Sequence, residues 1–317
     1  MIETLQRTPE TAQASTRHPL VGIVILNWNR SDDTIACVAS LRRMAYENYR
    51  VVVVDNGSKD DSVVKLRAAY PDLDLIENGQ NLGFAGGNNV GIARMLAAGC
   101  DYVMLLNDDA EVAEDTISKL VEVAESDPRI GFVGPTICYY DQPRVMWFAG
   151  GQITSHGEPS HLGDLQELPA PGQPPRDMDY VTGCAILARR ELIERIGPLD
   201  PRFFIYFEET EWCTRGRQNG YRVVYVPDAV MWHKITPTAR IYSHRYLYLM
   251  TRNRLLYLHL TGAGLAAKLG AAVDTLRTVA SWLVRPQHRS MRPYALTPIR
   301  GLSAYALGQY GPPPSSL

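Results

Sequence analysis

The chain has 317 residues, of which 45% are hydrophobic and 21% charged, and its formal net charge is −2. This balance is typical of a globular protein with a sizeable core and argues against a general nucleic-acid-binding function. The five cysteines are scattered without a Cys-x-x-Cys pair, which argues against a disulfide framework or a structural zinc site and favours a reducing, cytoplasmic compartment. No run of about 20 uncharged apolar residues occurs, which argues against a membrane span.

The first part of the sequence alternates short apolar runs with polar segments of helical character. Strands are predicted at residues 21–26, 51–54, 73–77 and 102–106, and helices at about 31–44, 60–70, 92–98 and 115–125. The runs at 51–54 and 102–106 are apolar throughout, which is typical of strands buried on both faces of a parallel sheet. The alternation predicts an α/β fold with a mostly parallel central sheet flanked by helices.

This alternation changes after residue 135. Residues 140–180 are rich in proline and glycine and predict a hairpin followed by a long loop. Strands at 180–187 and 221–226 and helices at 189–196 and 208–219 follow, and from residue 242 onward the pattern is helical. The last long helix carries an apolar stripe at spacings of three and four residues, made of Leu265, Leu269, Val273, Leu276, Val279 and Leu283.

Two of the apolar runs end abruptly at acidic residues. Asp55 and Asn56 follow the run at 51–54, and Asn107, Asp108 and Asp109 follow the run at 102–106. In open α/β sheets, ligands bind beyond the carboxyl ends of the strands. Carboxylates there can hold Mg²⁺ or Mn²⁺ while phosphates fill the remaining positions, and Asp55 can accept hydrogen bonds from a ribose or a base. The alternative is turn chemistry, which the same residue types favour.

Amides and glycines add weaker signals near the same edge. Asn27 and Asn29 follow the first strand, where an amide can read a base or satisfy loop backbone. The glycine-rich stretch 83–91 leads into a predicted helix, whose N-terminus attracts phosphate. It has neither the dinucleotide-binding nor the Walker A pattern, so these glycines alone are weak evidence.

An aromatic run at 203–207 delivers Glu208, Glu209 and Glu211 to the start of a helix. Acids in a first turn complement the helix dipole, and a carboxylate against a hydrophobic wall also suits a general base, because burial raises its pKa toward neutrality. Trp212 can stack on a sugar or pack in the core. A lone histidine such as His233 is more often structural, but a nearby acidic cluster makes it a candidate metal ligand.

Taken together, these stretches resemble family 2 glycosyltransferases of the GT-A fold, in the rhamnosyltransferase-like and galactofuranosyltransferase-like branch. The resemblance runs from about residue 20 to residue 253, and the order and spacing of its stretches make it specific. The matching stretches are 24–29, 53–58, 81–89, 105–109, 182–184, 200–212, 220–223, 232–234 and 252–253. The resemblance implies inverting transfer of a sugar from a nucleotide diphosphate-sugar to an acceptor hydroxyl. It favours dTDP-rhamnose as donor, ahead of UDP- and GDP-sugars.

The resemblance also implies roles for individual residues. Glu209 or Glu208 would be the catalytic base, and Asp109 and His233 would bind a divalent metal, with the imidazole favouring Mn²⁺ over Mg²⁺. The residues expected to bind the donor nucleotide are Asn27, Asn29, Asp55, Asn56, Gly86, Asn88, Asn107 and Asp108. The residues expected near the acceptor are Trp147, Gly183, Cys184 and Trp212.

Two departures from the family pattern leave questions open. The DxD motif reads Asn107-Asp108-Asp109, so its first acid is an amide. The usual Glu-Asp-x-Asp reads 208–211 as Glu-Glu-Thr-Glu, so the base can be Glu208 or Glu209. A nucleotidyltransferase and a non-catalytic nucleotide-sugar binder of the same fold remain as alternatives at this point. The first of them would need a glycine-rich basic loop after the first strand, and residues 27–29 do not supply it.

The predicted organisation follows from these assignments. We expect a flexible tail at 1–18, a GT-A catalytic domain at 19–241, a helical region at 242–310 and a disordered tail at 311–317. The nucleotide-sugar half of the domain would span about 19–135 and the acceptor half about 136–241. The acceptor would be a glycan or a polyprenyl-diphosphate-linked molecule in cell-surface polysaccharide assembly. The apolar stripe predicts packing on the catalytic domain or on a second copy in a homodimer, with weak peripheral contact to the inner face of a membrane as a further expectation.

Overall fold

The computed structural model describes residues 18–235 and 243–317, and the statements below concern these residues. The predicted N-terminal tail therefore lies almost wholly outside the described residues, as does the boundary predicted at residue 241. No helix in the described ranges is both long and apolar enough to span a membrane.

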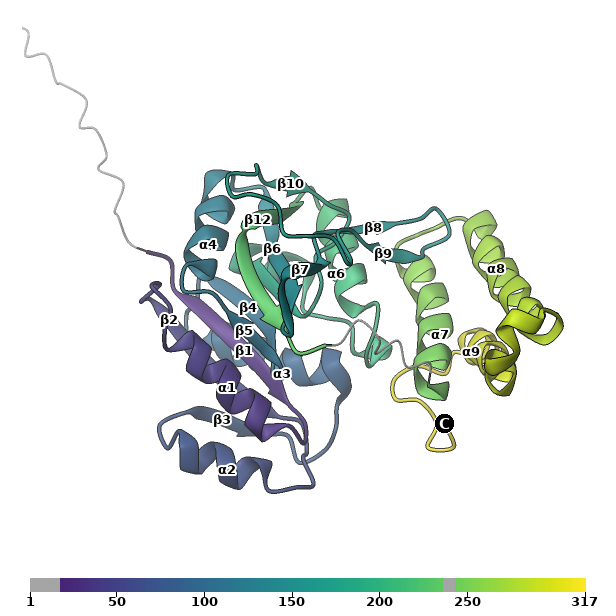
Figure 1. Ribbon diagram of the computed structural model, residues 1–317, viewed down its shortest axis with the longest axis horizontal. Coiled ribbons are helices and arrows are strands. Elements are labelled where there is room, and N and C mark those ends of the chain that lie inside the picture. The colour runs from purple at the N-terminus through teal and green to yellow at the C-terminus, as the bar shows by residue number, and fades with distance from the viewer. Residues whose placement is uncertain (1–17, 236–242) are drawn as a thin grey trace, which may run out of the picture.

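A mixed sheet forms the centre of the described fold (Figure 1), with strand order β10-β12-β6-β11-β4-β1-β2-β3. Two further strands join it, β5 beside β12 and β7 beside β6. The strands are β1 (Val21–Asn27), β2 (Tyr49–Asp55), β3 (Asp74–Glu77), β4 (Tyr102–Asn107), β5 (Ala110–Val112), β6 (Ile130–Tyr139), β7 (Gln142–Phe148), β10 (Arg176–Asp177), β11 (Ala185–Arg189) and β12 (Arg222–His233). A separate hairpin joins β8 (Gly151–Ile153) to β9 (Pro159–His161).

The sheet is parallel where the sequence predicts βαβ units and mixed beyond them, since β12 runs parallel to β6. β1 runs parallel to β2 and β4, and β11 lies antiparallel between β4 and β6. The helices are α1 (Ser31–Leu41), α2 (Ser62–Ala69), α3 (Gly83–Ala97), α4 (Thr116–Ser126), α5 (Arg190–Ile196), α6 (Glu208–Gln218), α7 (His244–Leu260), α8 (Leu265–Val284) and α9 (Leu296–Ala306), with short 3₁₀ segments η1 (Pro201–Phe203) and η2 (Pro286–Tyr294). The α/β fold with a helix-flanked central sheet is confirmed, although the sheet is mixed.

The glycine-rich stretch lies inside a helix, which the sequence analysis placed further along the chain. α3 begins at Gly83, and its glycines let it pack closely on β1. A Cβ on Gly87 would lie 2.5 Å from the Leu26 side chain, and one on Gly91 would lie 2.2 Å from that of Val24. These two glycines are therefore explained by helix–sheet packing rather than by an open phosphate-binding loop.

The C-terminal helices form a second layer beside the sheet domain, seen on the right of Figure 1. α8 packs through Ala271 and Trp282, both buried, while most of the predicted apolar stripe faces solvent. The prediction that this stripe packs on the catalytic domain is therefore wrong, and of its members only Val279 is buried. Gly311, the first residue of the tail predicted to be disordered, is attached to the fold, because its carbonyl oxygen accepts a hydrogen bond from Arg252. The disorder of the residues after it stays a prediction.

Candidate active site

The polar residues that follow β1 and β2 meet at one edge of the sheet. The strand register sets Asn27 opposite Asp55. The Asp55 carboxylate accepts hydrogen bonds from Asn27 Nδ2 at 2.8 Å and from the Ser58 backbone N–H at 3.0 Å. Thr34 in turn donates to Asn27 Oδ1, so the Asn27 amide is fixed on both sides. The network holds Asp55 in one orientation at the strand end.

Burial separates the predicted nucleotide-binding residues into two groups. The side chains of Asn27, Asn56 and Asn88 are 2% exposed or less, and each bonds to other parts of the protein. In this structure these amides therefore bond within the protein and hold the strand ends and the start of α3 in place. Their direct contact with a donor stays a prediction, as does that of Asp55, which is 3% exposed.

The other predicted donor contacts keep an open position. Asn29 is exposed, adopts a left-handed φ of 56°, and accepts a hydrogen bond from the Lys59 N–H. Gly86 is the glycine of α3 whose Cβ would touch only Leu82, at 3.0 Å. Asn107 lies at the end of β4 and is half-buried. These residues stay predictions.

Asp109 and His233 come together from distant parts of the chain, as predicted. β12 pairs with β5 so that His233 lies opposite Ala110, one residue after the acidic pair. The His233 Nε2 atom is 2.9 Å from Asp109 Oδ1. On its other oxygen, Asp109 accepts a hydrogen bond from Arg30 Nη1 at 2.8 Å. The carboxylate is therefore held between an imidazole and a guanidinium.

The two neighbouring carboxyl groups have opposite pKa shifts. Burial and the charge of Asp109 raise the pKa of Asp108 to about 7. Burial also acts to raise the pKa of Asp109, but the hydrogen bond from His233 and the charge of Arg30 outweigh it, and its pKa falls to about 2. Asp109 is thus the acid that stays ionised at neutral pH and can bind a cation.

Arg30 is a member of this site that the sequence analysis did not assign. Its guanidinium also forms an ion pair with Asp33 at 3.0 Å and lies 4.0 Å from Asp108. Because β1 and β4 are adjacent and parallel, a cation three residues beyond the end of β1 can reach acids beyond the end of β4. The predicted adjacency of these two strands was the sequence feature from which the place of Arg30 could have been inferred.

The chemistry of these side chains fits a divalent cation that a ligand helps to hold. In the described ranges, no group of three or more His, Cys, Asp or Glu is arranged to hold a metal by itself. Such ions are often bound by one or two protein groups, with substrate phosphates and water completing the shell. The buried His233 Nδ1 atom lacks a hydrogen-bond partner, which marks this imidazole as incompletely satisfied within the protein.

The two candidate bases lie next to each other at the start of α6. Glu208 is buried and Glu209 is half-buried, and the Oε2 atom of each is buried without a hydrogen-bond partner. Burial and the adjacent Glu209 charge raise the pKa of Glu208 well above its usual range. Burial also raises the pKa of Glu209, and backbone N–H groups, including that of Gly183, oppose the rise. The charge of Glu209 adds to the rise at Glu208, while backbone N–H groups of three residues oppose the rise at Glu209, which favours Glu209 as the predicted base.

The segment Thr182–Cys184 connects this base to the acidic edge. The Asn107 N–H donates to Cys184 O at 2.9 Å, and a Cβ on Gly183 would lie 3.6 Å from Glu209 Cβ. The Cys184 thiol itself is buried, so its predicted contact with an acceptor is corrected. The Trp147 ring is half-buried and its centroid lies 4.9 Å from that of His233, which keeps it a candidate for the acceptor wall.

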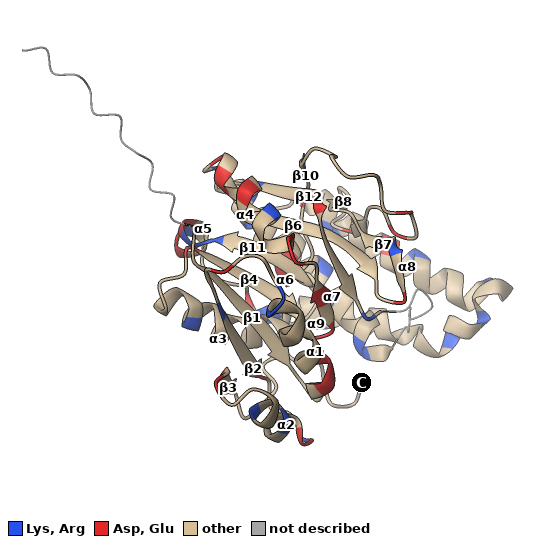
Figure 2. Cartoon of the chain, turned by 60° about the vertical axis from the view of Figure 1, so that its left-hand side comes forward, with Lys and Arg blue, Asp and Glu red and all other residues tan. Residues whose placement is uncertain are grey.

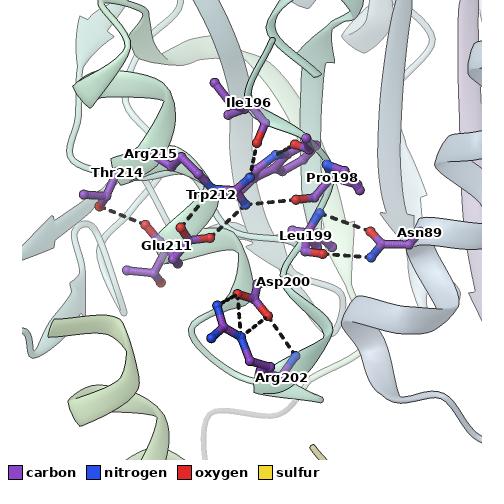
Figure 3. A network of polar contacts seen from close by, with 12 residues as sticks. Asn89, Ile196, Pro198, Leu199, Asp200, Arg202, Glu211, Trp212, Thr214 and Arg215 are labelled. Carbon is purple, nitrogen blue, oxygen red and sulfur yellow. Dashed lines mark hydrogen bonds and ion pairs between the residues drawn. The ribbon is translucent and has the colours of Figure 1, made fainter. Parts of the chain in front are cut away.

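Glu211 and Trp212 have structural roles in the network shown in Figure 3. Glu211 forms a buried ion pair with Arg215 at 2.9 Å, and Arg215 also donates to Pro198 O. Trp212 has no exposed surface, and its indole N–H donates to Gly197 O at 2.8 Å. The prediction that Trp212 contacts the acceptor is therefore wrong, and its alternative assignment as a core residue is correct.

The loop that delivers Glu209 has an unusual backbone. Phe204, Tyr206 and Phe207 all have left-handed φ angles, between 68° and 76°. For residues with a Cβ this conformation costs about 1 kcal/mol or more each. Something in the surrounding structure must therefore hold the loop in place.

Two fully buried residues of α7 supply that constraint. Asn253 Nδ2 donates to the carbonyl oxygens of Phe203, Ile205 and Tyr206, at 2.8–3.0 Å. Arg252 Nε donates to Asn253 Oδ1, and its Nη2 donates to Phe203 O. The sequence resemblance included Arg252 and Asn253 but assigned no role to them. The structure shows that they fix the loop before Glu209.

We expect Asn253→Leu to lower the free energy of unfolding by about 2–4 kcal/mol, because the carbonyl groups of Ile205 and Tyr206 lose the Asn253 donor and that of Phe203 keeps only Arg252 of the two side chains. Chemical denaturation measures this change. Asn219→Leu is the matched control, since Asn219 is exposed at the end of α6 and bonds to Arg215 O, and its cost should stay within about 0.5 kcal/mol. Equal stability of Asn253→Leu and wild type would contradict the assigned role.

Comparison with known proteins relates this geometry to a family. The model of Glycosyl transferase family 2 matches residues 22–197. The low-salt glycan biosynthesis hexosyltransferase Agl10 of Haloferax volcanii is 28% identical over 244 residues, which cover 74% of each chain. An N-acetylglucosaminyl-diphospho-decaprenol L-rhamnosyltransferase of Mycobacterium tuberculosis is 30% identical over 64% of this chain and 72% of its own. The dTDP-rhamnosyl transferase RfbF of Shigella flexneri is 26% identical over 68% and 74%.

Solved structures agree with this relationship at the level of the fold. The mannosyltransferase PcManGT from Pyrobaculum calidifontis, solved in complex with GDP-Man and Mn²⁺, aligns with a TM-score of 0.54 over 93% of this chain and 89% of its own. The sequence identity in that alignment is 18%, so the likeness concerns architecture.

Proposed function

The chain belongs to glycosyl transferase family 2 and has the GT-A fold, and we propose that it transfers L-rhamnose from dTDP-rhamnose to a hydroxyl of a lipid-linked or glycan acceptor. The observation that carries the proposal is the arrangement at the sheet edge. Asp109 and His233 converge there, and the Thr182–Cys184 segment, which accepts a hydrogen bond from Asn107, contacts Glu209 through Gly183. Because the chain is a glycosyltransferase, the nucleotidyltransferase alternative is no longer supported.

The donor would bind across the ends of β1, β2 and β4. Asp55, held by Asn27 and Ser58, accepts hydrogen bonds from the nucleoside, and Asn29 lies at the exposed side of that pocket. Asp109 and His233 would hold a divalent cation, which neutralises negative charge on the leaving diphosphate. Arg30 brings a second positive charge to the same place, and its side chain is 44% exposed, so a phosphate can approach the guanidinium.

Glu209 performs the proton transfer in this proposal. An acceptor hydroxyl is a weak nucleophile at neutral pH, and Glu209 removes its proton as the oxygen attacks the anomeric carbon. The new C–O bond forms as the bond from that carbon to the diphosphate oxygen breaks. Attack from the side opposite the leaving group inverts the anomeric configuration. The protonated Glu209 then releases its proton to solvent.

The donor and acceptor classes rest on the relatives. Two of them are named for rhamnosyl transfer, one with dTDP-rhamnose as the stated donor type. The mycobacterial relative is named for an N-acetylglucosaminyl-diphospho-decaprenol acceptor, which is a sugar on a polyprenyl diphosphate. Mn²⁺ is the metal in the PcManGT complex, and an imidazole ligand also favours Mn²⁺ over Mg²⁺.

A donor panel tests the proposal. The purified protein is incubated with dTDP-rhamnose, UDP-galactose, UDP-N-acetylglucosamine or GDP-mannose, with Mn²⁺, Mg²⁺ or EDTA, and nucleoside diphosphate release is measured. We expect release from dTDP-rhamnose in Mn²⁺, stimulation by a short-chain N-acetylglucosaminyl diphospho-lipid, and loss of turnover in EDTA. Preference for another donor would replace the rhamnose assignment. Full turnover after dialysis against EDTA would remove the metal from the mechanism.

A further inference from the structure

The outward face of α8 is apolar. Leu265, Leu269, Leu276 and Leu283 are 50–70% exposed, and Val273 beside them is 42% exposed. At 3.6 residues per turn these positions lie along one side of the helix. Single exposed leucines are ordinary on protein surfaces, but a stripe along five turns of one helix indicates a contact surface.

The opposite face of α8 already has its partner. Ala271, Val279 and Trp282 are buried toward the rest of the C-terminal region, and Asp274 accepts hydrogen bonds from His156 and Arg254. The helix is therefore attached to the protein through one side while presenting leucines on the other. The exposed stripe is not the result of a misplaced core face.

Positive charge surrounds this apolar stripe. Residues 243–317 contain nine lysines and arginines and one acidic side chain, a formal charge of +8, although the whole chain carries −2. The rest of the chain therefore carries a formal charge of −10. Lys268 and Arg277 flank the stripe on α8, and Arg285, Arg289 and Arg292 follow it, all four arginines being exposed. Figure 2 shows blue segments along these C-terminal helices and most red segments around the sheet.

We propose that α8 and the η2 segment after it dock the protein on an anionic lipid bilayer. The leucines would enter the boundary between headgroups and acyl chains, and the arginines would contact the phosphates, as in helices that lie in a membrane interface. Since no helix in the described ranges can span a bilayer, this contact is peripheral. A second copy docked through the same face would bring the exposed arginines beside the stripe, Arg277, Arg285, Arg289 and Arg292, of both copies together, so charge favours the bilayer over a homodimer.

The docking surface connects to the catalytic loop through one helix. α8 packs on α7, and α7 carries the Arg252 and Asn253 side chains that hold the loop before Glu209. If the proposed function holds, a lipid-linked acceptor would lie in the same bilayer that the protein binds. The docking itself does not depend on the donor or on turnover, so the two proposals succeed or fail separately.

Vesicle flotation tests the docking. Full-length protein is mixed with vesicles of phosphatidylcholine alone or of phosphatidylcholine and phosphatidylglycerol in equal parts, at low salt and at about 0.5 M NaCl, where the Debye length is only a few Å. We expect flotation with the anionic vesicles at low salt, at least tenfold weaker partitioning in high salt, and little binding to phosphatidylcholine. Absence of flotation with anionic vesicles at low salt overturns the proposal, and so does equal flotation with both vesicle types.

Paired variants separate the apolar and charged contributions. Leu269→Asn with Leu276→Asn should weaken partitioning at least tenfold, because two apolar side chains no longer enter the interface. The matched control is Val64→Asn on α2, which is 70% exposed and should float like wild type. If the leucine pair floats like wild type, the stripe is not the docking surface.

The charge variants are Arg277→Gln with Arg285→Gln. Each lost cation near an anionic surface should weaken binding about fivefold. Arg42→Gln with Arg195→Gln removes two exposed cations from the sheet domain and serves as control. Sedimentation of wild type and the leucine pair completes the test. A wild-type dimer that the leucine changes convert to a monomer, without flotation, would assign the stripe to a second copy and overturn the membrane proposal.

Discussion

Asp109→Asn is expected to lower the rate of sugar transfer about 10³-fold while the protein stays folded. The change keeps the size of the side chain but removes the only carboxylate at this edge whose pKa is lowered, to about 2. A metal ion that stabilises a leaving diphosphate contributes several kcal/mol to the barrier, and Asp109 is the residue proposed to hold it. Nucleoside diphosphate release measures the rate, and electron paramagnetic resonance of Mn²⁺ measures metal binding.

Two variants control this expectation. Asp33→Asn changes another acid that pairs with Arg30, at 3.0 Å, but leaves Asp109 in place, and it should retain most of the activity. Arg30→Gln removes positive charge from Asp109, so Mn²⁺ should bind more tightly, by about fivefold for a partly exposed pair. Unchanged Mn²⁺ affinity in Asp109→Asn would show that the metal is held elsewhere.

Glu209→Gln is expected to lower the transfer rate about 10²-fold or more without weakening donor binding. Glutamine fills the same space but cannot accept the proton of the acceptor hydroxyl, and general bases contribute about this factor. Titration calorimetry with donor and a transfer assay separate binding from turnover. The loss of rate should appear in kcat, while the dissociation constant of the donor stays unchanged.

Glu208→Gln is the matched control for this variant. Burial raises the pKa of Glu208 well above its usual range and so favours the protonated form, which glutamine resembles. This variant should therefore keep most of its activity. A large loss in Glu208→Gln together with wild-type turnover in Glu209→Gln would exchange the roles of the two residues.

The sequence was informative where chemistry follows from strand topology. Parallel strands bring their carboxyl ends to one edge, so the meeting of Asp55, Asn107 and Asp109 could be predicted from three apolar runs and the residues after them. The same reasoning could have included Arg30, since it lies three residues beyond the end of β1, but a single arginine after a turn has no pattern that distinguishes it. His233 was predictable only because a metal site was already suspected.

Burial was the main property that the sequence could not provide. Asn27, Asn56 and Asn88 have the right residue type and region for a nucleotide pocket, yet neighbouring donors and acceptors enclose them. Trp212 fails as an acceptor contact because α6 turns it toward Phe132 in the core. An amphipathic or aromatic pattern gives a periodicity and does not say which face is covered.

The C-terminal helix shows this limit most clearly. Its apolar stripe predicted a packed face, but α8 buries the side that carries Ala271 and Trp282 and exposes the leucines. The left-handed residues of the loop before Glu209 were equally unpredictable, because Phe204, Tyr206 and Phe207 are not residue types that favour such angles. Only the buried Asn253 amide, far along the chain, explains how the loop is held.

The pH dependence of kcat, in wild type and in Glu209→Gln, tests most directly whether Glu209 takes the acceptor proton at this edge. A base must be ionised, so its rate falls as pH falls through its pKa, and a raised pKa moves that fall above the range of an ordinary glutamate. We predict a single-proton decline on the acid side in wild type at saturating donor and Mn²⁺, and no such decline in the residual activity of Glu209→Gln. The same acid-side decline in both proteins would contradict the assignment.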